Sequence, residues 1–440
     1  MKKHMRASTA PVALNPAAMA QEGSAVAVAF EEVRSSFDKF CLIAGIEALQ
    51  ELLQEEAAAL CGERHQRHAG RRGRRWGETR SPVAFHGGRV GVDRPRVRSR
   101  EGQQELVLPS WAAAQDENWL SQWAMNQMLI NVSTRKFRRS VRLPSGDVGS
   151  IPGDGTSKSA VSRKFVALSR AKLRDWLASD LSKLDLLAIQ IDGLHIGDEL
   201  ILVAAVGLDG QGEKHPLGLV EGATENAATV QALLDNLVER GLDSAGVWLF
   251  IIDGAKALSK AIRRTFGQDT PIQRCQVHKA RNITERLPKS LHAAVRKALR
   301  QAWELDDAVK AEQLVRNLAR RLEKDWPGIS ATILEGLEEI LCVVRLRLPQ
   351  DLRRSLACTN IIENMNGTIR QVSRNVKRWR DASMALRWTA AGMMEAKKGF
   401  RRLKAYKQLP KLRDALIALK AARATTLADH SGLANLGAAA

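Results

Sequence analysis

A chain of 440 residues, 45% of them hydrophobic, is long enough for several domains and apolar enough to fold them, which excludes an intrinsically disordered protein. Lysine and arginine total 68 against 48 acidic residues, so the formal net charge is +20 and the expected partner is a polyanion, either nucleic acid or an acidic membrane surface. No apolar stretch approaches the roughly 20 residues of a membrane span, and no secretory signal is evident. Five scattered cysteines indicate reduced thiols, so we expect a soluble cytoplasmic protein.

Residues 1–110 are predicted to be a flexible, basic N-terminal region with one helix. Residues 1–30 lack periodicity, whereas 37–60 carry apolar side chains at helical spacing. The segment 61–100 has twelve arginines and three acidic residues, and two interpretations of it stay open. It is either a solvated linker or an arm whose guanidinium groups follow DNA phosphates. The arm would use Arg71, Arg72, Arg74 and Arg75.

Residues 111–183 are predicted to be helical and to form a helix-turn-helix-like DNA-binding region. A first helix is expected at 133–141 and a second at 156–177, which has an apolar stripe and hydroxyl side chains near its N-cap. A basic amphipathic surface helix without contact to DNA would have the same pattern, so this alternative stays open. The candidate DNA contacts are Ser157, Ser159, Arg163 and Lys164.

Residues 184–286 differ in kind and are predicted to form the first part of a mixed α/β core. Three strands joined by short glycine-containing turns precede a helix at 225–240, a fourth strand and a fifth. A further helix is expected at 279–286. The strands are expected at 186–196, 200–208, 217–220, 247–252 and 271–277.

Three carboxylates mark a candidate site. Asp192 lies within the first predicted strand, where a carboxylate is costly unless a positive partner meets it, and our hypothesis is a divalent metal ion. Asp253 ends the fourth strand, where an open α/β sheet exposes polar side chains, although it could simply be a helix N-cap. Glu363 lies near the start of a late helix, where it could instead form a capping box with Asn360.

The rest of the chain is predicted to be helical. Residues 287–356 read as an all-helical insertion, 357–382 as the last core helix with Glu363, and 383–440 as a basic helical tail. Lys256 and Lys279 are expected to be solvated helix residues or, alternatively, phosphate contacts. Further candidate DNA contacts follow Glu363 along the chain: Arg370, Arg374, Lys377 and Arg378.

Four sequence motifs together resemble the IS256 family of bacterial, Mutator-like insertion-sequence transposases of the DDE type. These are Asp192 in IDGLH, Asp253 in IIDGAK, Cys275-x-x-His278 in QRCQVHKARNI, and Glu363 in TNIIENMNGTIR. The resemblance covers roughly residues 119–388. It implies a ribonuclease H-like catalytic core with a large all-helical insertion, preceded by a helix-turn-helix DNA-binding region and followed by a basic helical tail.

The resemblance also implies a chemistry. Asp192, Asp253 and Glu363 would hold two Mg²⁺ ions, with Mn²⁺ as a possible substitute, because oxygen ligands suit these ions. Without cations, two carboxylates about 4 Å apart would repel by roughly 4 kcal/mol. Water would nick the transposon end, and the liberated 3′-hydroxyl would then attack target DNA. The implied partner is double-stranded DNA, both terminal inverted repeats and target, bound by a homodimer or higher oligomer.

Other residues take roles only through this resemblance. His278 would be catalytic through a hydrogen bond to a phosphate or a metal-bound water, and Cys275 would belong to the same structural or active-site motif. A structural zinc site would need four ligands, and the sequence near Cys275 offers no second pair. Trp326 would support flanking DNA or would simply pack in its helix. Asn360 and Asn364 could orient Glu363.

Three alternatives to a transposase stay open. A catalytically decayed transposase would act as a DNA-binding regulator without cleaving DNA. A ribonuclease H-like nuclease or junction resolvase would share the carboxylates, but such enzymes are usually smaller and lack a large helical insertion. A binder of acidic membranes is the weakest alternative, because the basic residues are not confined to one amphipathic helix.

Overall fold

The computed structural model describes residues 25–437 apart from 65, 67–69, 86–87, 103, 116–117, 136–156, 197–199 and 225. The chain divides into two compact units, one of residues 1–127 with 132–165 and one of residues 128–131 with 166–440. Among the described helices, none is both long and apolar enough to cross a lipid bilayer. All five cysteines are free thiols, as expected from their spacing.

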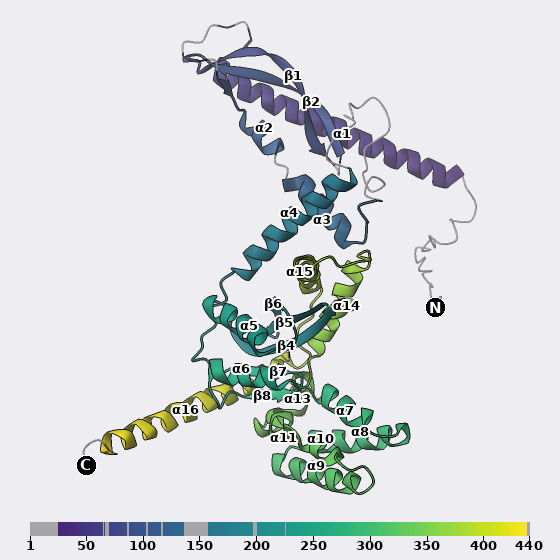
Figure 1. The fold of residues 1–440 in the computed structure, drawn as a ribbon. Coiled ribbons are helices and arrows are strands. Elements are labelled where there is room, and N and C mark those ends of the chain that lie inside the picture. Colours follow the sequence, from purple (N-terminus) through teal and green to yellow (C-terminus); the bar gives the residue numbers. More distant parts are fainter. Residues whose placement is uncertain are drawn as a thin grey trace, which may run out of the picture. The chain divides into compact units, whose positions relative to one another are not determined.

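The first unit is built on a long helix and a β-hairpin. Helix α1 (Ala25–Cys61) packs against strands β1 (Gly73–Phe85) and β2 (Gly88–Ser99), which pair antiparallel (Figure 1). The short strand β3 (Glu105–Leu106) extends the sheet, and α2 (Pro109–Ala114) follows it. Val83 of β1 and Leu106 of β3 pack against one apolar core, which is formed by buried residues of α1, of β2 and of the chain from Leu108 into α2: Leu53, Ala57, Cys61, Val92, Val97, Leu108 and Trp111.

Residues 73–85 and 88–99 form a β-hairpin, so the solvated-linker interpretation is wrong for these residues, whereas contact of their arginines with DNA phosphates stays a prediction. The arginine content hid a row of buried valines in β2, among them Val90 and Val92. Several arginines serve the fold itself: the Arg94 guanidinium stacks 5.0 Å from the centre of the Trp111 ring, and both Arg94 and Arg96 form ion pairs with Glu105. A high arginine content therefore does not indicate a solvated segment here.

Two helices follow, α3 (Asn118–Leu129) and α4 (Lys158–Leu177). The predicted helix at 156–177 is confirmed, and Ser157 caps it, since the Ser157 Oγ accepts a hydrogen bond of 3.2 Å from the Ala160 N–H. The helix expected at 133–141 lies mostly outside the described residues, and 133–135 are not helical. A helix-turn-helix therefore stays a prediction.

The second unit contains a five-stranded mixed sheet in the order β6-β5-β4-β7-β8. Strands β4 (Leu186–Ile196), β5 (Leu200–Asp209) and β6 (Lys214–Glu221) pair antiparallel, whereas β7 (Leu249–Ile252) and β8 (Ile272–Arg274) run parallel to β4. All five strands were predicted, the first with its observed bounds. The third begins earlier than predicted, at Lys214, the fourth begins later, at Leu249, and the fifth ends at Arg274, before a helix that begins at Gln276.

Helices cover both faces of this sheet (Figure 1). On one face, α5 (Ala227–Glu239) and α6 (Lys256–Phe266) bury Leu234 and Ile262 against Ile189 and Ile191 of β4. On the other face, the apolar residues of α14 (Asn360–Ser373) and α15 (Ala382–Lys398) pack on Leu194 and Ile196. The alternation of apolar side chains along β4 thus serves two separate cores.

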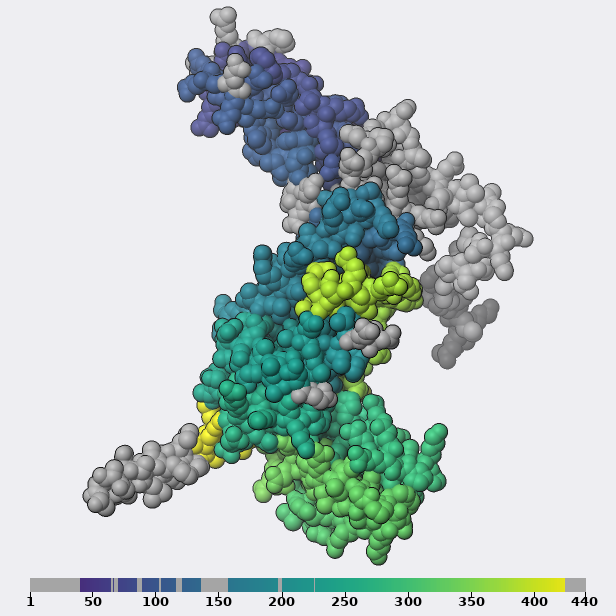
Figure 2. All heavy atoms as spheres, in the orientation of Figure 1, coloured from purple at the N-terminus to yellow at the C-terminus, as the bar shows by residue number. Residues whose placement is uncertain are grey.

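The remaining helices form the insertion and the tail. After α7 (Gln276–Glu285), the insertion comprises α8 (Lys289–Glu304), α9 (Ala308–Glu323), α10 (Ile329–Leu334), α11 (Leu337–Ile340), α12 (Cys342–Arg345) and α13 (Gln350–Leu356). Its helices share an apolar core of their own, and Figure 2 shows their atoms gathered in one green mass. The 3₁₀ helix Tyr406–Gln408 and α16 (Leu409–Gly437) end the described chain.

Two glycines test how closely α14 and α15 pack. A Cβ on Gly392 in α15 would lie 3.0 Å from the Ile369 Cα in α14, whereas a Cβ on Gly367 in α14 would meet nothing within 4 Å. Because alanine favours a helix over glycine by about 1 kcal/mol, Gly367→Ala should raise the free energy of unfolding by up to that amount. Gly392→Ala should lower it by about 1–3 kcal/mol through overpacking. Urea denaturation of both variants measures the difference, and a stabilised Gly392→Ala would show that the helices do not pack this closely.

Candidate active site

The parallel pairing of β4 with β7 places two carboxylates side by side at one edge of the sheet. Ile191 pairs with Ile252, and these are the last paired residues of the two strands. Asp192 and Asp253 directly follow these two isoleucines in the sequence, and because the strands are parallel, the register places both carboxylates at the same level of the sheet. Asp192 stays within β4 and is 7% exposed, while Asp253 begins the loop between β7 and α6.

Asp253 is not the N-cap of α6, so this structural alternative does not hold. That position belongs to Ala255, and no side chain caps the helix. One oxygen of Asp253 accepts a hydrogen bond of 2.9 Å from the Ala255 N–H and holds the turn. The other accepts one of 3.1 Å from the Thr224 hydroxyl.

Glu363 reaches the same region from the first turn of α14. Its neighbours Ile361, Ile362 and Met365 are buried against the sheet, so the helix presents Glu363 on its more exposed side. The capping-box alternative does not hold, because Thr359 occupies the N-cap position and no side chain caps the helix. Asn360 and Asn364 line other pockets, whereas Asn366 faces the pocket of Glu363.

Cys275 and His278 lie where β8 gives way to α7. The His278 Nε2 lies 3.7 Å from the Glu363 Oε1, and Cys275 is buried. Its proximity to Cys275, together with the negative charges of Asp192 and Glu363, raises the pKa of His278 to about 9. Although burial opposes ionisation, the neighbouring His278 lowers the pKa of the Cys275 thiol. The two shifts favour an imidazolium at His278 paired with a thiolate at Cys275, and the Nε2 side of the ring lies beside Glu363.

One pocket of about 900 Å³ brings these residues together. Asp192, Asp253 and Glu363 all line it, and so do Cys275 and His278. Basic residues meet the same space, among them Lys256, Arg281 and Arg370. Two carboxylates of the sheet thus share one cavity with Glu363, which lies more than a hundred positions further along the chain, and with cationic side chains at its border.

The electrostatics of Asp192 explain why this pocket needs positive charge. Burial raises the pKa of Asp192 to about 6, the charge of Asp253 adds to the rise, and the Thr359 hydroxyl, His278 and the Gly193 N–H oppose it. A carboxylate in this environment is ionised at neutral pH at a cost in free energy. A bound cation would remove that cost.

Another group of side chains lies closer together than the three pocket carboxylates. Among the described residues, the ligand atoms of Asp209, Glu213 and His215 alone lie within 4.8 Å of one another. Asp209 is already occupied: it accepts hydrogen bonds of 2.9 and 2.8 Å from the Gln211 and Glu213 N–H groups, and its other oxygen lies 2.8 Å from the His215 Nε2. This group therefore closes the turn between β5 and β6.

Of the other predicted contacts, Arg370, Lys256 and Lys279 line the pocket, whereas the remaining ones do not. Arg374, Lys377 and Arg378 are exposed beyond the end of α14. Trp326 lies in the turn between α9 and α10 and packs against the apolar core of the insertion, and support of flanking DNA by Trp326 stays a prediction. Lys279 was predicted to be solvated or to contact phosphate, but it is buried and its Nζ donates a hydrogen bond of 2.6 Å to the Glu335 carbonyl oxygen.

The candidates in the first unit and in α4 have clear positions as well. Arg71, Arg74 and Arg75 line one surface pocket, and Arg75 donates a hydrogen bond of 2.8 Å to the Gln54 Oε1. The side chain of Arg72 is exposed. In α4, Ser157, Ser159 and Arg163 are exposed, whereas Lys164 is half-buried.

The sequence did not single out the arginines around α7. Arg281 lines both the carboxylate pocket and a second pocket of about 570 Å³ between α7, α8 and α13. Arg296, Arg300, Arg354 and Trp303 border this second pocket. The helical spacing of Arg281, Arg296 and Arg300 is visible in the sequence, but only the packing of α7 on α8 brings these residues together.

The raised pKa of Asp192 predicts an unusual effect on stability. At pH 8 in EDTA, Asp192→Asn should raise the free energy of unfolding by up to about 3 kcal/mol, because it removes a shift of roughly 2 pKa units. The pKa of Asp192 is higher in the folded than in the unfolded protein, so the ionised carboxylate destabilises the fold above pH 6. The increase in the free energy of unfolding caused by Asp192→Asn should therefore shrink as the pH falls towards 4. Urea denaturation at pH 8 and pH 4.5 measures it, with Glu213→Gln as control. A destabilised Asp192→Asn at pH 8 would contradict this assignment.

Comparisons with known proteins identify the family. The protein-family model described as "Transposase, Mutator family" matches residues 21–402 of this chain. The transposase for insertion sequence element IS6120 of Mycolicibacterium smegmatis is 30% identical over 223 residues, 50% of this chain and 67% of the relative. The transposase for IS256 in transposon Tn4001 of Staphylococcus aureus is 27% identical over 286 residues, 62% and 69% of the two chains. The transposase for ISRM5 of Rhizobium meliloti is 23% identical over 368 residues, 84% and 89%. The chain belongs to the Mutator family of transposases, as the resemblance to the IS256 family predicted.

Proposed function

We propose that this transposase binds the terminal inverted repeats of its insertion sequence and catalyses metal-dependent DNA cleavage and strand transfer with Asp192, Asp253 and Glu363. The observation that carries the proposal is their convergence on one pocket from β4, from the end of β7 and from α14. The sheet order, with β4 central between an antiparallel and a parallel half, supports a ribonuclease H-like core.

The residues present fit a divalent cation. Three carboxylates supply oxygen ligands, which Mg²⁺ and Mn²⁺ prefer. Burial raises the pKa of Asp192, so its ionised form carries a cost in free energy that a bound cation would offset. Asp192, Asp253 and Glu363 would hold the ions. When bound, two such ions polarise the scissile phosphodiester and stabilise the charge on the entering and leaving oxygens.

Side chains of the pocket itself would bind and orient the DNA strand. Lys256, Arg281 and Arg370 stand at its border, where their charges would pair with phosphate oxygens. His278 carries a proton beside Glu363 and would donate it in a hydrogen bond to a phosphate oxygen. The same three carboxylates would act in both steps. Water would be the nucleophile in cleavage, and the 3′-hydroxyl would be the nucleophile in strand transfer.

Recognition of the transposon ends would fall to the parts of the chain outside the catalytic pocket. Arg71, Arg74 and Arg75 form a cationic surface on the first unit, and α4 exposes Arg163 near its N-terminus. We propose that these surfaces contact DNA backbone and bases respectively, and that two copies of the chain pair the two ends. Bacterial DNA in the cytoplasm would be the substrate.

Removing one pocket carboxylate should abolish catalysis without abolishing binding. Asp192→Asn, Asp253→Asn and Glu363→Gln should each slow Mg²⁺-dependent cleavage of DNA carrying the cognate inverted repeat by at least about a thousandfold. Each variant should still retard the same DNA in an electrophoretic mobility assay, because the backbone contacts lie elsewhere.

Glu213→Gln is the matched control, since it removes a carboxylate from the turn between β5 and β6 and should leave cleavage unchanged. Normal cleavage by any pocket variant would show that its residue is misassigned. Binding without cleavage by the wild-type chain would make it a catalytically decayed DNA-binding regulator.

The arginines of the first unit predict the salt dependence of binding. Replacing Arg71, Arg72, Arg74 and Arg75 together by alanine should flatten the plot of log affinity against log salt by about 0.9 for each phosphate that the protein no longer neutralises. Replacing the same four by lysine keeps the charge and should leave the slope nearly unchanged. Fluorescence anisotropy from about 50 to 300 mM KCl measures both variants. An unaltered slope in the alanine variant would show that this surface does not contact DNA.

A further inference from the structure

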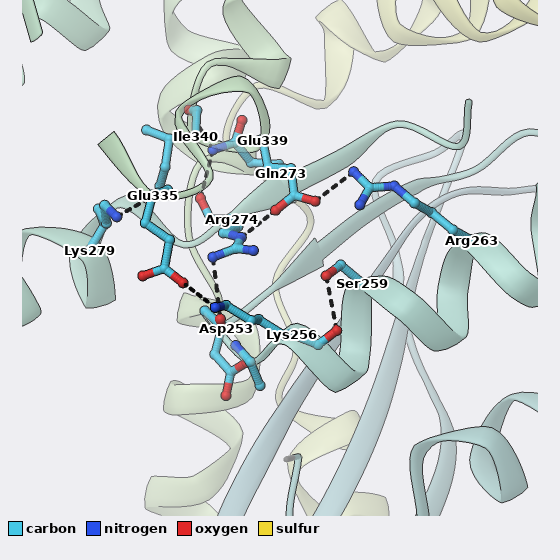
Figure 3. Close-up of polar contacts among 12 residues, drawn as sticks. Asp253, Lys256, Ser259, Arg263, Gln273, Arg274, Lys279, Glu335, Glu339 and Ile340 are labelled. Atoms are coloured by element: carbon cyan, nitrogen blue, oxygen red, sulfur yellow. Dashed lines mark hydrogen bonds and ion pairs between the residues drawn. The ribbon is translucent and has the colours of Figure 1, made fainter. Parts of the chain in front are cut away.

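A buried carboxylate of the insertion binds two arginines of the catalytic core. Glu339 lies in α11 and is 8% exposed. Its Oε1 accepts a hydrogen bond of 2.6 Å from the Arg263 Nη2 in α6, and its Oε2 accepts one from the Arg274 Nε at the end of β8 (Figure 3). Because removing one partner of such a buried pair leaves a charge without compensation, the three side chains form one structural unit.

Arg274 also contacts the loop that carries Asp253. Its Nη1 donates a hydrogen bond of 3.3 Å to the carbonyl oxygen of Gly254, the residue directly after Asp253. Residues 253–255 are neither strand nor helix, and Gly254 has open space where a Cβ would lie. The loop is held by the Asp253 carboxylate, which accepts hydrogen bonds from the Ala255 N–H and the Thr224 hydroxyl, and by Arg274, which is the contact that links it to the insertion.

The contacts around Arg274 anchor the insertion on both sides of this loop. Lys256 in α6 lies 3.5 Å from a carboxylate oxygen of Glu335, and Lys279 in α7 donates to the Glu335 carbonyl (Figure 3). Gln273 donates a hydrogen bond of 2.9 Å to the Ile340 carbonyl oxygen. Gly336 has a φ of +63°, and a Cβ there would lie 2.7 Å from the Arg274 Cζ, so a glycine leaves room for the guanidinium.

We propose that Arg274 is a positioning residue: held by Glu339 of the insertion, it fixes the Asp253 loop so that the Asp253 carboxylate faces Asp192 in the geometry that binds a metal ion. This inference rests on the proposed function, since it assigns Asp253 as a metal ligand. A metal site requires its ligands to be held within about 0.5 Å, and residues behind the ligands supply that restraint. The helical insertion thereby becomes part of the catalytic geometry.

Arg263 provides an internal control, because Arg263 and Arg274 bind the same carboxylate but only Arg274 reaches the Asp253 loop. Arg274→Lys keeps a positive charge beside Glu339, yet a single ammonium group cannot bind Glu339 and Gly254 with the geometry of the guanidinium fork. Arg263→Lys makes the same chemical change at the same ion pair without touching the loop.

The experiment measures Mn²⁺ binding to the full-length chain by electron paramagnetic resonance of the free ion, together with the Mg²⁺ concentration needed for half-maximal cleavage. Arg274→Lys should weaken Mn²⁺ binding by about tenfold, the lower end of the effect of residues behind metal ligands, and should raise the Mg²⁺ requirement in parallel. Arg263→Lys should stay within about twofold of the wild type. Retardation of inverted-repeat DNA should be unchanged in both.

Equal Mn²⁺ affinity in the two lysine variants would overturn the proposal and make Arg274 a purely structural residue. If Arg274→Lys does not fold, as thermal unfolding would show, Glu339→Gln takes its place, and its Mn²⁺ binding must then be weaker than that of Arg263→Lys. Asp253→Asn separates this inference from the proposed function. Mn²⁺ binding that survives Asp253→Asn contradicts the metal site itself, whereas binding that is lost in Asp253→Asn but normal in Arg274→Lys contradicts only the positioning role.

Discussion

The negative charges of Asp192, within β4, and of Asp253, directly after the parallel strand β7, repel each other, and this repulsion is the constraint on the pocket of the second unit. The register of β4 and β7 brings Asp192 and Asp253 to the same level, and α14 adds Glu363 to the pocket. Burial raises the pKa of Asp192 to about 6, so the cluster stores unfavourable free energy in the absence of compensating charge. Catalytic sites commonly keep such poised groups, because the same arrangement binds the ion that the reaction needs.

The positive charges near the pocket fall into two groups with different consequences. Arg281 and Arg370 border the cavity, as do Lys256 and His278, whose nitrogen atoms lie 3.5 Å from Glu335 and 3.7 Å from Glu363. Arg274 and Lys279 are buried and engaged with Glu339 and Glu335, which ties the insertion to the core beside Asp253. Burial also lowers the pKa of Lys279 to about 8, an effect that the negative charge of Glu335 opposes and the positive charge of Arg274 strengthens. The insertion is therefore more than an appended helical domain.

Much of this arrangement could be predicted from the sequence where the physical signal is local. The alternation along 186–196 predicts β4 with its observed bounds, and the position of Asp253 after an apolar run predicts a strand end. The β-hairpin at 73–99 was missed because its arginines outnumber its valines, and the contacts that satisfy those arginines come from Trp111 and Glu105 beyond the hairpin. The boundary between β8 and α7 was misplaced because Val277, a strand former, lies half-exposed on a helix.

The site was predicted residue by residue only where a family motif marked it. Asp192, Asp253, Glu363 and His278 line one pocket as expected, whereas the link from Glu339 through Arg274 to Gly254 depends on tertiary contacts across more than sixty positions of the chain. No local pattern distinguishes Glu339 from the exposed acids around it. The burial of Lys279 could not be predicted for the same reason, because helical spacing alone does not reveal that the insertion covers this side chain.

The most direct test of the central claim is the anomalous scattering of Mn²⁺ in crystals of the full-length protein grown or soaked with the ion. We expect two Mn²⁺ peaks in the pocket, coordinated by carboxylate oxygens of Asp192, Asp253 and Glu363. A single strong peak at Asp209, Glu213 and His215, with no density among the three pocket carboxylates, would contradict the account.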